Sequence, residues 1–276
     1  MSAPENPGDG LERPILRNGS EVPPDLGITD VHEIFPIWTA GDLVRVLVVL
    51  FLAMFFADTS AVLVADMLHT YRHTNAHAIT TDARVVVPAQ AVAYLLTVWF
   101  IVRMISRHYG ANFAQAVHWR FPERWLKFIL GGAFLALVLQ PISSKLPIPR
   151  QMPIDQYFQS PLAAWIMALF GTFIAPFCEE LFFRGLLFPV LVRRIGMTGG
   201  VVVTSVLFAF IHASQLANAW APVILLFAVG VVLTLVRARA HSLAASVLVH
   251  TGYNAALFSL VYIGSEGFHN FTRLTQ

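Results

Sequence analysis

The chain has 276 residues, of which 57% are hydrophobic and 12% are charged, and its formal net charge is +2. Soluble domains contain about 45–50% apolar and about 25% charged residues, so this composition excludes an ordinary soluble domain and predicts an all-α, polytopic membrane protein. No basic run with interleaved aromatic residues points to a nucleic-acid partner, and the single cysteine, Cys178, excludes an internal disulfide.

The first 41 residues differ from the rest of the chain. They are rich in Pro, Gly, Asp and Glu and have no apolar periodicity, which predicts a disordered or loosely ordered leader over residues 1–41. They do not read as a signal peptide, because no apolar core follows the start. We expect residues 42–160 to hold the N-terminal transmembrane helices.

Apolar runs of about 17–25 residues can cross a bilayer as helices, and on this basis we expect about seven spans. These are Asp42–Ala65, Val85–Ser106, Trp125–Gln140, residues 161 to about 193, Gly199–Ala213, Trp220–Arg237 and Ser242–Ile263. The fourth span has a helix start signal, with Ser160 as the N-cap and Pro161 at the first helical position. Pro176 lies inside this span and predicts a kink.

The distribution of Lys and Arg predicts how the helices are oriented, because short cytoplasmic loops carry an excess of these residues. The loops after the second, fourth and sixth expected spans are basic. They contain Arg103, Arg107, Arg120, Arg124, Lys127, Arg193, Arg194, Arg237 and Arg239. Seven spans place these three loops on one side, so we expect a cytoplasmic N-terminus and an external C-terminus.

Two adjacent acids, Glu179 and Glu180, lie inside the fourth apolar span. An acidic residue at a membrane helix centre costs about 2.5–3.5 kcal/mol on insertion scales, so such residues face a protein interior or a wet cavity and have partners. Arg184 is one turn from Glu180 and can neutralise or orient a carboxylate. Further candidate partners are His212 on the fifth span and His250 on the seventh.

The depths of these polar residues predict one buried site. At 1.5 Å per residue, Glu180, His212, His250 and Asn254 each lie about 15–20 Å from the same end of the helix bundle. A carboxylate near two imidazoles can hold and deprotonate water, either directly or through a bound metal ion. The amide of Asn254 can donate a hydrogen bond to an oxyanion. These parts suffice for water-mediated hydrolysis of an amide bond.

Three motifs with i,i+4 spacing occur in order on these helices. They are Glu179-Glu180-x-x-x-Arg184, Phe208-x-x-x-His212 and His250-x-x-x-Asn254. The set resembles the signature of the CAAX-protease and bacteriocin-processing (CPBP) family of intramembrane proteases, which includes the type II CAAX prenyl endopeptidases, also called Abi proteins. The resemblance covers residues 161–260 approximately.

The resemblance implies an intramembrane endopeptidase with a four-helix catalytic core over residues 161–263, followed by a C-terminal tail over 264–276. It implies Glu179 as the base that activates water, completed by Glu180 and Arg184, with His212 and His250 lining the site and Asn254 as the oxyanion donor. It leaves open whether a divalent metal such as zinc takes part; the ligands would then be Glu179, His212 and His250. The expected setting is the inner membrane of a bacterial cell, with a peptide or membrane-protein substrate.

Other interpretations remain open from the residues alone. The chain can be a catalytically inactive member of the same fold that binds or stabilises a partner protein, with Glu180 and Arg184 as a structural ion pair. A proton or solute transporter would need a second polar layer, which the sequence lacks. Cys178 is a weak candidate nucleophile, because buried cysteine is usually inert. His69, His73 and His77 have i,i+4 spacing in the first loop and are expected to form a solvated face.

Overall fold

The computed structural model describes residues 37–68, 76–149, 151–158 and 160–271. The predicted leader therefore lies outside the described residues up to residue 36, as do His69, His73 and the side chain of His77. Within the described ranges every regular element is helical and no strand occurs, which confirms the all-α prediction.

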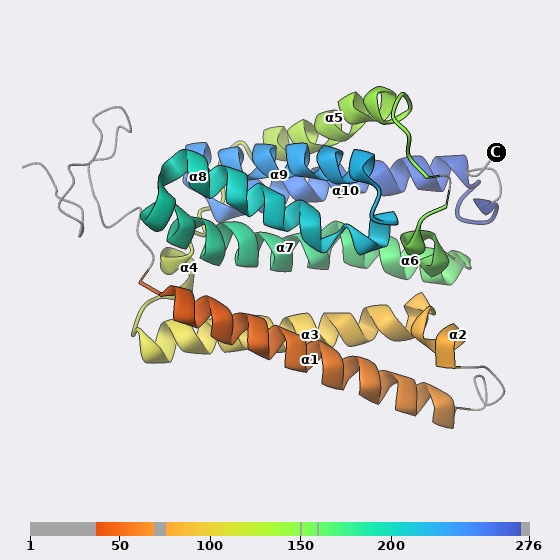
Figure 1. The fold of residues 1–276 in the computed structure, drawn as a ribbon, viewed down its shortest axis with the longest axis horizontal. Helices are drawn as coiled ribbons and strands as arrows, with labels where there is room; N and C mark the ends of the chain where they lie inside the picture. The colour runs from red at the N-terminus through yellow and green to blue at the C-terminus, as the bar shows by residue number, and fades with distance from the viewer. Residues whose placement is uncertain (1–36, 69–75, 150, 159, 272–276) are drawn as a thin grey trace, which may run out of the picture. The chain divides into compact units, whose positions relative to one another are not determined.

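The main helical segments follow the expected apolar stretches closely (Figure 1). They are α1 (Ala40–Met67), α3 (Ala83–Arg103), α5 (Trp125–Ser143), α6 (Pro161–Leu169), α7 (Ala175–Glu180), α8 (Phe188–Ile211), α9 (Trp220–Ala240) and α10 (Leu243–Gly264). Short helices α2 (Ala76–Thr80) and α4 (Phe113–Ala116) lie in the connections, and π-helical turns occupy Met104–His108, Phe170–Ile174 and Leu181–Leu187. The predicted start of α6 is confirmed, because Ser160 caps it by accepting from the backbone N–H of Ala163.

Six continuous helical stretches of the described chain are long and apolar enough to cross a membrane, where seven spans were expected. The difference lies in one stretch, Pro161–Ile211, whose 51 residues would extend roughly 77 Å if straight, far beyond a bilayer core of about 30 Å. This stretch reverses at Gly196, whose φ of 76° and ψ of 175° are accessible essentially only to glycine. The expected fourth and fifth spans are therefore the two arms of one helical hairpin.

The second arm of the hairpin packs back against the first. A Cβ atom on Gly200 would lie 2.9 Å from Cγ2 of Val192, so the absent side chain allows the arms to meet closely. With this reversal, successive long segments alternate in direction, and the ends of α3, of the first arm and of α9 lie at the same side of the bundle in Figure 1. These are the ends that carry the basic loops.

Small residues also hold α10 against α5. A Cβ atom on Gly252 would lie 2.1 Å from the carbonyl oxygen of Ile129, and one on Gly132 would lie 1.9 Å from that of Val249. The two backbones are thus in direct contact, as is common where membrane helices associate through small residues. α10 also contacts α9 and α7, so it lies at the centre of the helices that carry the polar motifs.

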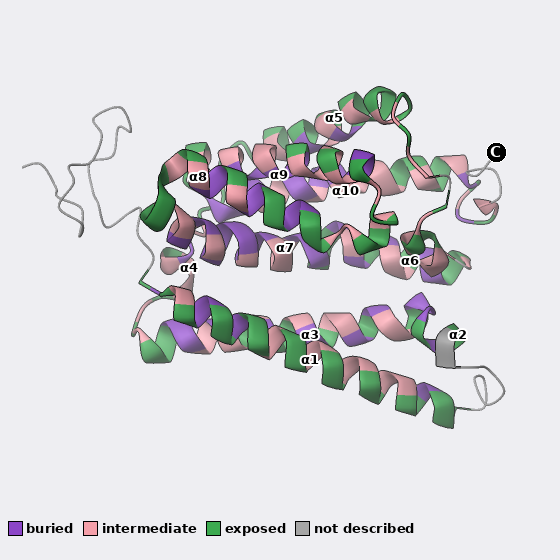
Figure 2. Cartoon of the chain, in the orientation of Figure 1, coloured by how far each residue is buried: buried purple, intermediate pink, exposed green. Residues whose placement is uncertain are grey.

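Burial shows which surfaces suit lipid and which suit polar contacts (Figure 2). Large apolar side chains are exposed along α1, where Phe51 is 72% and Met67 is 82% exposed. The interior instead contains charged groups, since Glu180 and Arg184 are both 0% exposed. This distribution is that of a multi-pass membrane protein, whose lipid-facing surface is apolar and whose polar groups lie inside the bundle.

Candidate active site

The two glutamates lie at the end of α7, which follows the π-helical turn Phe170–Ile174. Such turns are rare and occur often at functional sites. In this turn the N–H of Ala175 donates to the carbonyl of Phe170, whereas in an α-helix it would donate to Gly171. In the π-helical register the donor to Gly171 would be residue 176, and Pro176 has no N–H. The backbone therefore supplies no donor to the Gly171 carbonyl in either register.

A side chain from α10 provides the missing hydrogen bond. Asn254 donates from Nδ2 to the carbonyl oxygen of Gly171 at 2.7 Å. Gly171 permits the close approach of α10, because a Cβ atom there would lie 2.7 Å from Cε2 of Phe258, one turn beyond Asn254. Asn254 is thus an interhelical link, and its amide retains a second N–H. Its expected role as an oxyanion donor stays a prediction.

Glu180 is completely buried and has a partner for each carboxylate oxygen. Oε1 accepts from Nη1 of Arg184 at 2.8 Å and from Nδ1 of His250 at 2.9 Å. Oε2 accepts from the hydroxyl of Ser246. A charge at this depth is tolerable only when it is paired and hydrogen-bonded, and Glu180 meets both conditions.

Arg184 is equally buried and is held by α9 as well as by Glu180. Its Nη2 donates to the carbonyl of Gly230 at 3.0 Å and its Nε to the hydroxyl of Thr234 at 3.2 Å. The guanidinium carbon lies 4.4 Å from the ring centroid of Phe208, within the range of cation–π attraction. Glu180 and Arg184 therefore form a fixed ion pair that connects α7, α8, α9 and α10.

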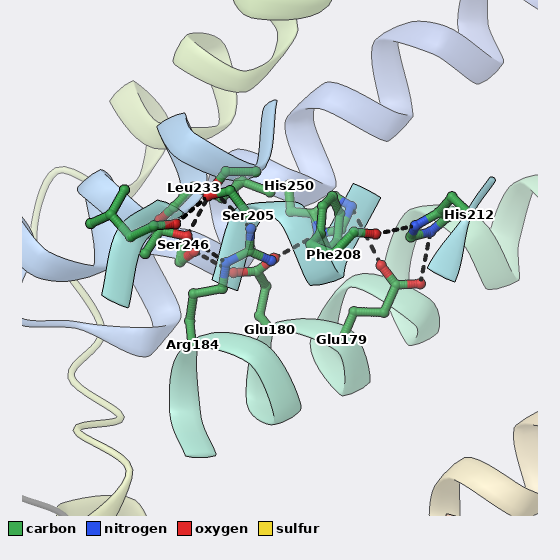
Figure 3. A network of polar contacts seen from close by, with 12 residues as sticks. Glu179, Glu180, Arg184, Ser205, Phe208, His212, Leu233, Ser246 and His250 are labelled. Carbon is green, nitrogen blue, oxygen red and sulfur yellow. Dashed lines mark hydrogen bonds and ion pairs between the residues drawn. The ribbon is translucent and has the colours of Figure 1, made fainter. Parts of the chain in front are cut away.

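Glu179 has a different environment from its neighbour. Its side chain is 14% exposed, and its two oxygens lie 3.9 Å from Nε2 of His212 and 3.8 Å from Nε2 of His250. Figure 3 shows the Glu179 carboxylate directed at the His212 ring, while Glu180 and Arg184 form a separate group beside it. Glu179 is thus the carboxylate of the pair that is open to a further ligand.

The hydrogen bonds of the two imidazoles assign their tautomers. Nδ1 of His212 lies 2.8 Å from the carbonyl oxygen of Phe208, and Nδ1 of His250 lies 2.9 Å from the carboxylate of Glu180. Each Nδ1 faces an acceptor and therefore carries a proton. Nε2 of each ring is the nitrogen that faces Glu179.

The structure brings five of the six predicted site residues into one cluster and places the sixth, Asn254, against Gly171. Three contributors were not predicted: Ser246, Thr234 and the carbonyl of Gly230. The sequence contained a signal for the first, because Ser246 is one turn before His250 on α10. It contained no comparable signal for α9, where Thr234 and Gly230 are uncharged residues within an apolar stretch.

The three side chains named as possible metal ligands are Glu179, His212 and His250. Among the described residues, no group of three or more His, Cys, Asp or Glu side chains is arranged to hold a metal ion. The distances from Glu179 to Nε2 of the two imidazoles are 3.8 and 3.9 Å.

The fold and the cluster define a class of protein: a multi-pass helical membrane protein with a buried glutamate–histidine site. Residues 161–256, about a third of the chain, match the family model described as type II CAAX prenyl endopeptidase Rce1-like. This match confirms the resemblance drawn from the three motifs, and the matched family is one of proteases. The match includes every residue of the motifs. Comparisons with curated proteins and with solved structures gave no match.

Proposed function

We propose that the protein is an intramembrane endopeptidase in which Glu179 activates the water that attacks a peptide bond. The observation that carries the proposal is the contrast between the two acids. Glu180 is buried and fully hydrogen-bonded, whereas Glu179 is partly exposed and lies 3.8–3.9 Å from Nε2 of two imidazoles. These separations are too long for direct hydrogen bonds and suit a bridging water molecule.

In the proposed reaction Glu179 takes one proton from a water molecule that His212 orients through Nε2. The remaining hydroxide forms a bond to the carbonyl carbon of the substrate, and the carbonyl oxygen becomes an oxyanion. The second N–H of Asn254 donates to that oxyanion, an interaction of the kind worth about 3–4 kcal/mol in another protease. The C–N bond then breaks, and Glu179 returns the proton to the leaving amine.

Glu180 is proposed to act through His250 rather than on the substrate. Its carboxylate fixes the tautomer of His250 and holds the ring so that Nε2 faces Glu179. Arg184 and Ser246 in turn fix Glu180. This is a positioning role, like that of the carboxylates that hydrogen-bond to the catalytic histidine in other hydrolytic sites.

The decisive experiment compares Glu179→Gln with Glu180→Gln in purified full-length protein. We expect Glu179→Gln to lower turnover about 10²–10⁴-fold, as for loss of a general base, with an unchanged unfolding temperature in detergent. Glu180→Gln leaves Arg184 buried without its counter-ion, at a cost of about 3–5 kcal/mol, so it should lower the unfolding temperature as well. Cys178→Ser is the matched control on the same turn and should retain activity.

The substrate for this assay comes from a comparison of membrane-protein N- and C-termini between cells that carry wild-type protein and Glu179→Ala. New termini that depend on Glu179 identify substrates. Full cleavage by Glu179→Gln would contradict the role of Glu179 as the base, whereas an absence of any cleavage by the wild-type protein would favour an inactive protein of this fold that binds a partner. For an inactive binding protein, the partner complex should survive Glu179→Ala, Glu179→Gln and the Cys178→Ser control. Metal analysis of the same preparation decides whether a divalent ion accompanies the site.

A further inference from the structure

A second candidate binding site lies between the start of α5 and the end of α9, outside the glutamate–histidine cluster. A cavity of about 360 Å³ is found there. Its lining includes Lys127, Phe128, Val232, Leu235, Val236 and Arg239. The four α9 positions recur at i, i+3, i+4 and i+7, so they belong to one face of the helix.

The cavity combines two chemistries at different depths. Lys127 is in the first turn of α5 and Arg239 in the last turn of α9, and both are exposed. Val232 lies about 10 Å further into the bundle than Arg239 at the rise of an α-helix. A ligand that matches both parts needs an anionic group at the helix ends and an apolar chain along α9.

The surrounding charges favour an anion. Arg237 is on the same turn of α9, is only 7% exposed, and its Nε has no hydrogen-bond partner among the described residues. Arg120, which has the same sign, adds electrostatic repulsion at Arg237. Glu123 is the single acid in the segment 118–127, and its side chain is exposed. This end of the bundle therefore has a positive potential that an anionic headgroup would reduce.

We propose that this cavity binds an anionic phospholipid. The phosphate lies between Lys127 and Arg239, and one acyl chain lies along the face formed by Val232, Leu235 and Val236. The location suits this ligand, because basic residues just beyond a membrane helix attract anionic headgroups. A free phosphate ion would use the two cations but not the apolar wall, which distinguishes the lipid from a soluble anion.

The test measures binding of a fluorescent phosphatidylglycerol to the full-length protein in a neutral detergent. Removing both charges in Lys127→Gln/Arg239→Gln should weaken binding about 30-fold, because this is the usual contribution of two basic residues to the affinity for an anionic membrane surface. Val232→Trp fills the apolar part without a change of charge and should also abolish binding. Arg107→Gln/Arg194→Gln is the matched control, since it removes two exposed charges from other loops at the same side of the bundle.

The expected result is that both cavity variants lose the lipid while the control binds as wild type does, and that neither inorganic phosphate nor phosphatidylcholine competes. Wild-type affinity in either cavity variant would overturn the proposal. Equal losses in the control would show general surface attraction instead, and displacement by inorganic phosphate would show a simple anion site. Unfolding temperatures and size-exclusion profiles of all variants verify that each is folded.

Discussion

At the scale of single residues, the main result is that two adjacent glutamates have opposite environments. Successive residues on a helix differ by about 100° in direction, so their side chains meet different surroundings. Glu180 faces Arg184, His250 and Ser246, and Glu179 faces the imidazole nitrogens. Glu179, which the family resemblance names as the base, is also the acid that the contacts leave accessible.

The hydrogen bond between Asn254 and Gly171 allows the structural and catalytic roles of Asn254 to be separated. Asn254→Ala should lower the unfolding free energy, by up to about 1–3 kcal/mol for an unsatisfied carbonyl that is partly buried. It should also lower turnover. Pro176→Ala restores a backbone N–H at the position that the Gly171 carbonyl needs in a π-helical turn. The double variant Asn254→Ala/Pro176→Ala should therefore recover unfolding temperature while remaining impaired in turnover.

The control for this pair is Pro176→Ala alone, which should keep most of the activity. If the double variant recovers turnover together with stability, Asn254 is a structural link only and a different donor serves the oxyanion. Unfolding temperature in detergent and initial cleavage rates on one substrate provide the two measurements.

At the scale of elements, the reversal at Gly196 determines how the two halves of the site meet. Because its φ and ψ lie in a region that only glycine occupies without strain, Gly196→Ala should destabilise the protein by about 1–3 kcal/mol. The Cβ atom itself meets no atom within 4 Å, so the loss would come from the backbone alone. Gly110→Ala is a suitable comparison, since Gly110 also has a positive φ of 64° and open surroundings but lies outside the long helices.

Thermal unfolding of both alanine variants is the measurement. Gly196→Ala should lower the unfolding temperature because the φ of 76° and ψ of 175° at Gly196 are open essentially only to glycine, and Gly110→Ala reports the effect at a positive φ outside the long helices. A wild-type unfolding temperature for Gly196→Ala would mean that the turn has another conformation.

The sequence predicts these elements to different degrees. Hydropathy locates the long helices within a few residues, because burial in lipid requires long apolar runs. The pair Glu180–Arg184 is predictable because i,i+4 residues share a face. The link between Asn254 and Gly171 is not, since it depends on the π-helical turn and on the rotation of α10 against α7. The contribution of α9 through Thr234 was missed for the same reason: a hydroxyl in an apolar helix does not identify its partner.

At the scale of the whole molecule, the alternation of the helices predicts which loops share a side. With the hairpin counted as two arms, Lys145 after α5 and Arg194 near the hairpin turn lie at opposite ends of the bundle. In a Cys178→Ser background, a cysteine at position 194 should react with a membrane-impermeant thiol reagent only after permeabilisation. A cysteine at position 145 should react in intact cells, because the basic loops are expected in the cytoplasm.

Both labelling results depend on the predicted orientation of the helices in the membrane, so each result checks the other. Labelling of position 194 and not of 145 in intact cells would invert the orientation, and labelling of both would contradict the alternation. Blocking with a permeant reagent before lysis provides the control for each position.

The hairpin turned by Gly196 also has a consequence for how the protein is made. The arm with Glu179 and Glu180 and the arm that ends near His212 are joined by a turn of very few residues, so we expect them to enter the bilayer as a pair. The acids therefore reach the hydrocarbon region beside polar groups of the adjacent arm rather than alone, which reduces the cost of inserting them. α9 and α10 are synthesised later, and they complete the ion-pair network around Glu180 only when they pack against this hairpin.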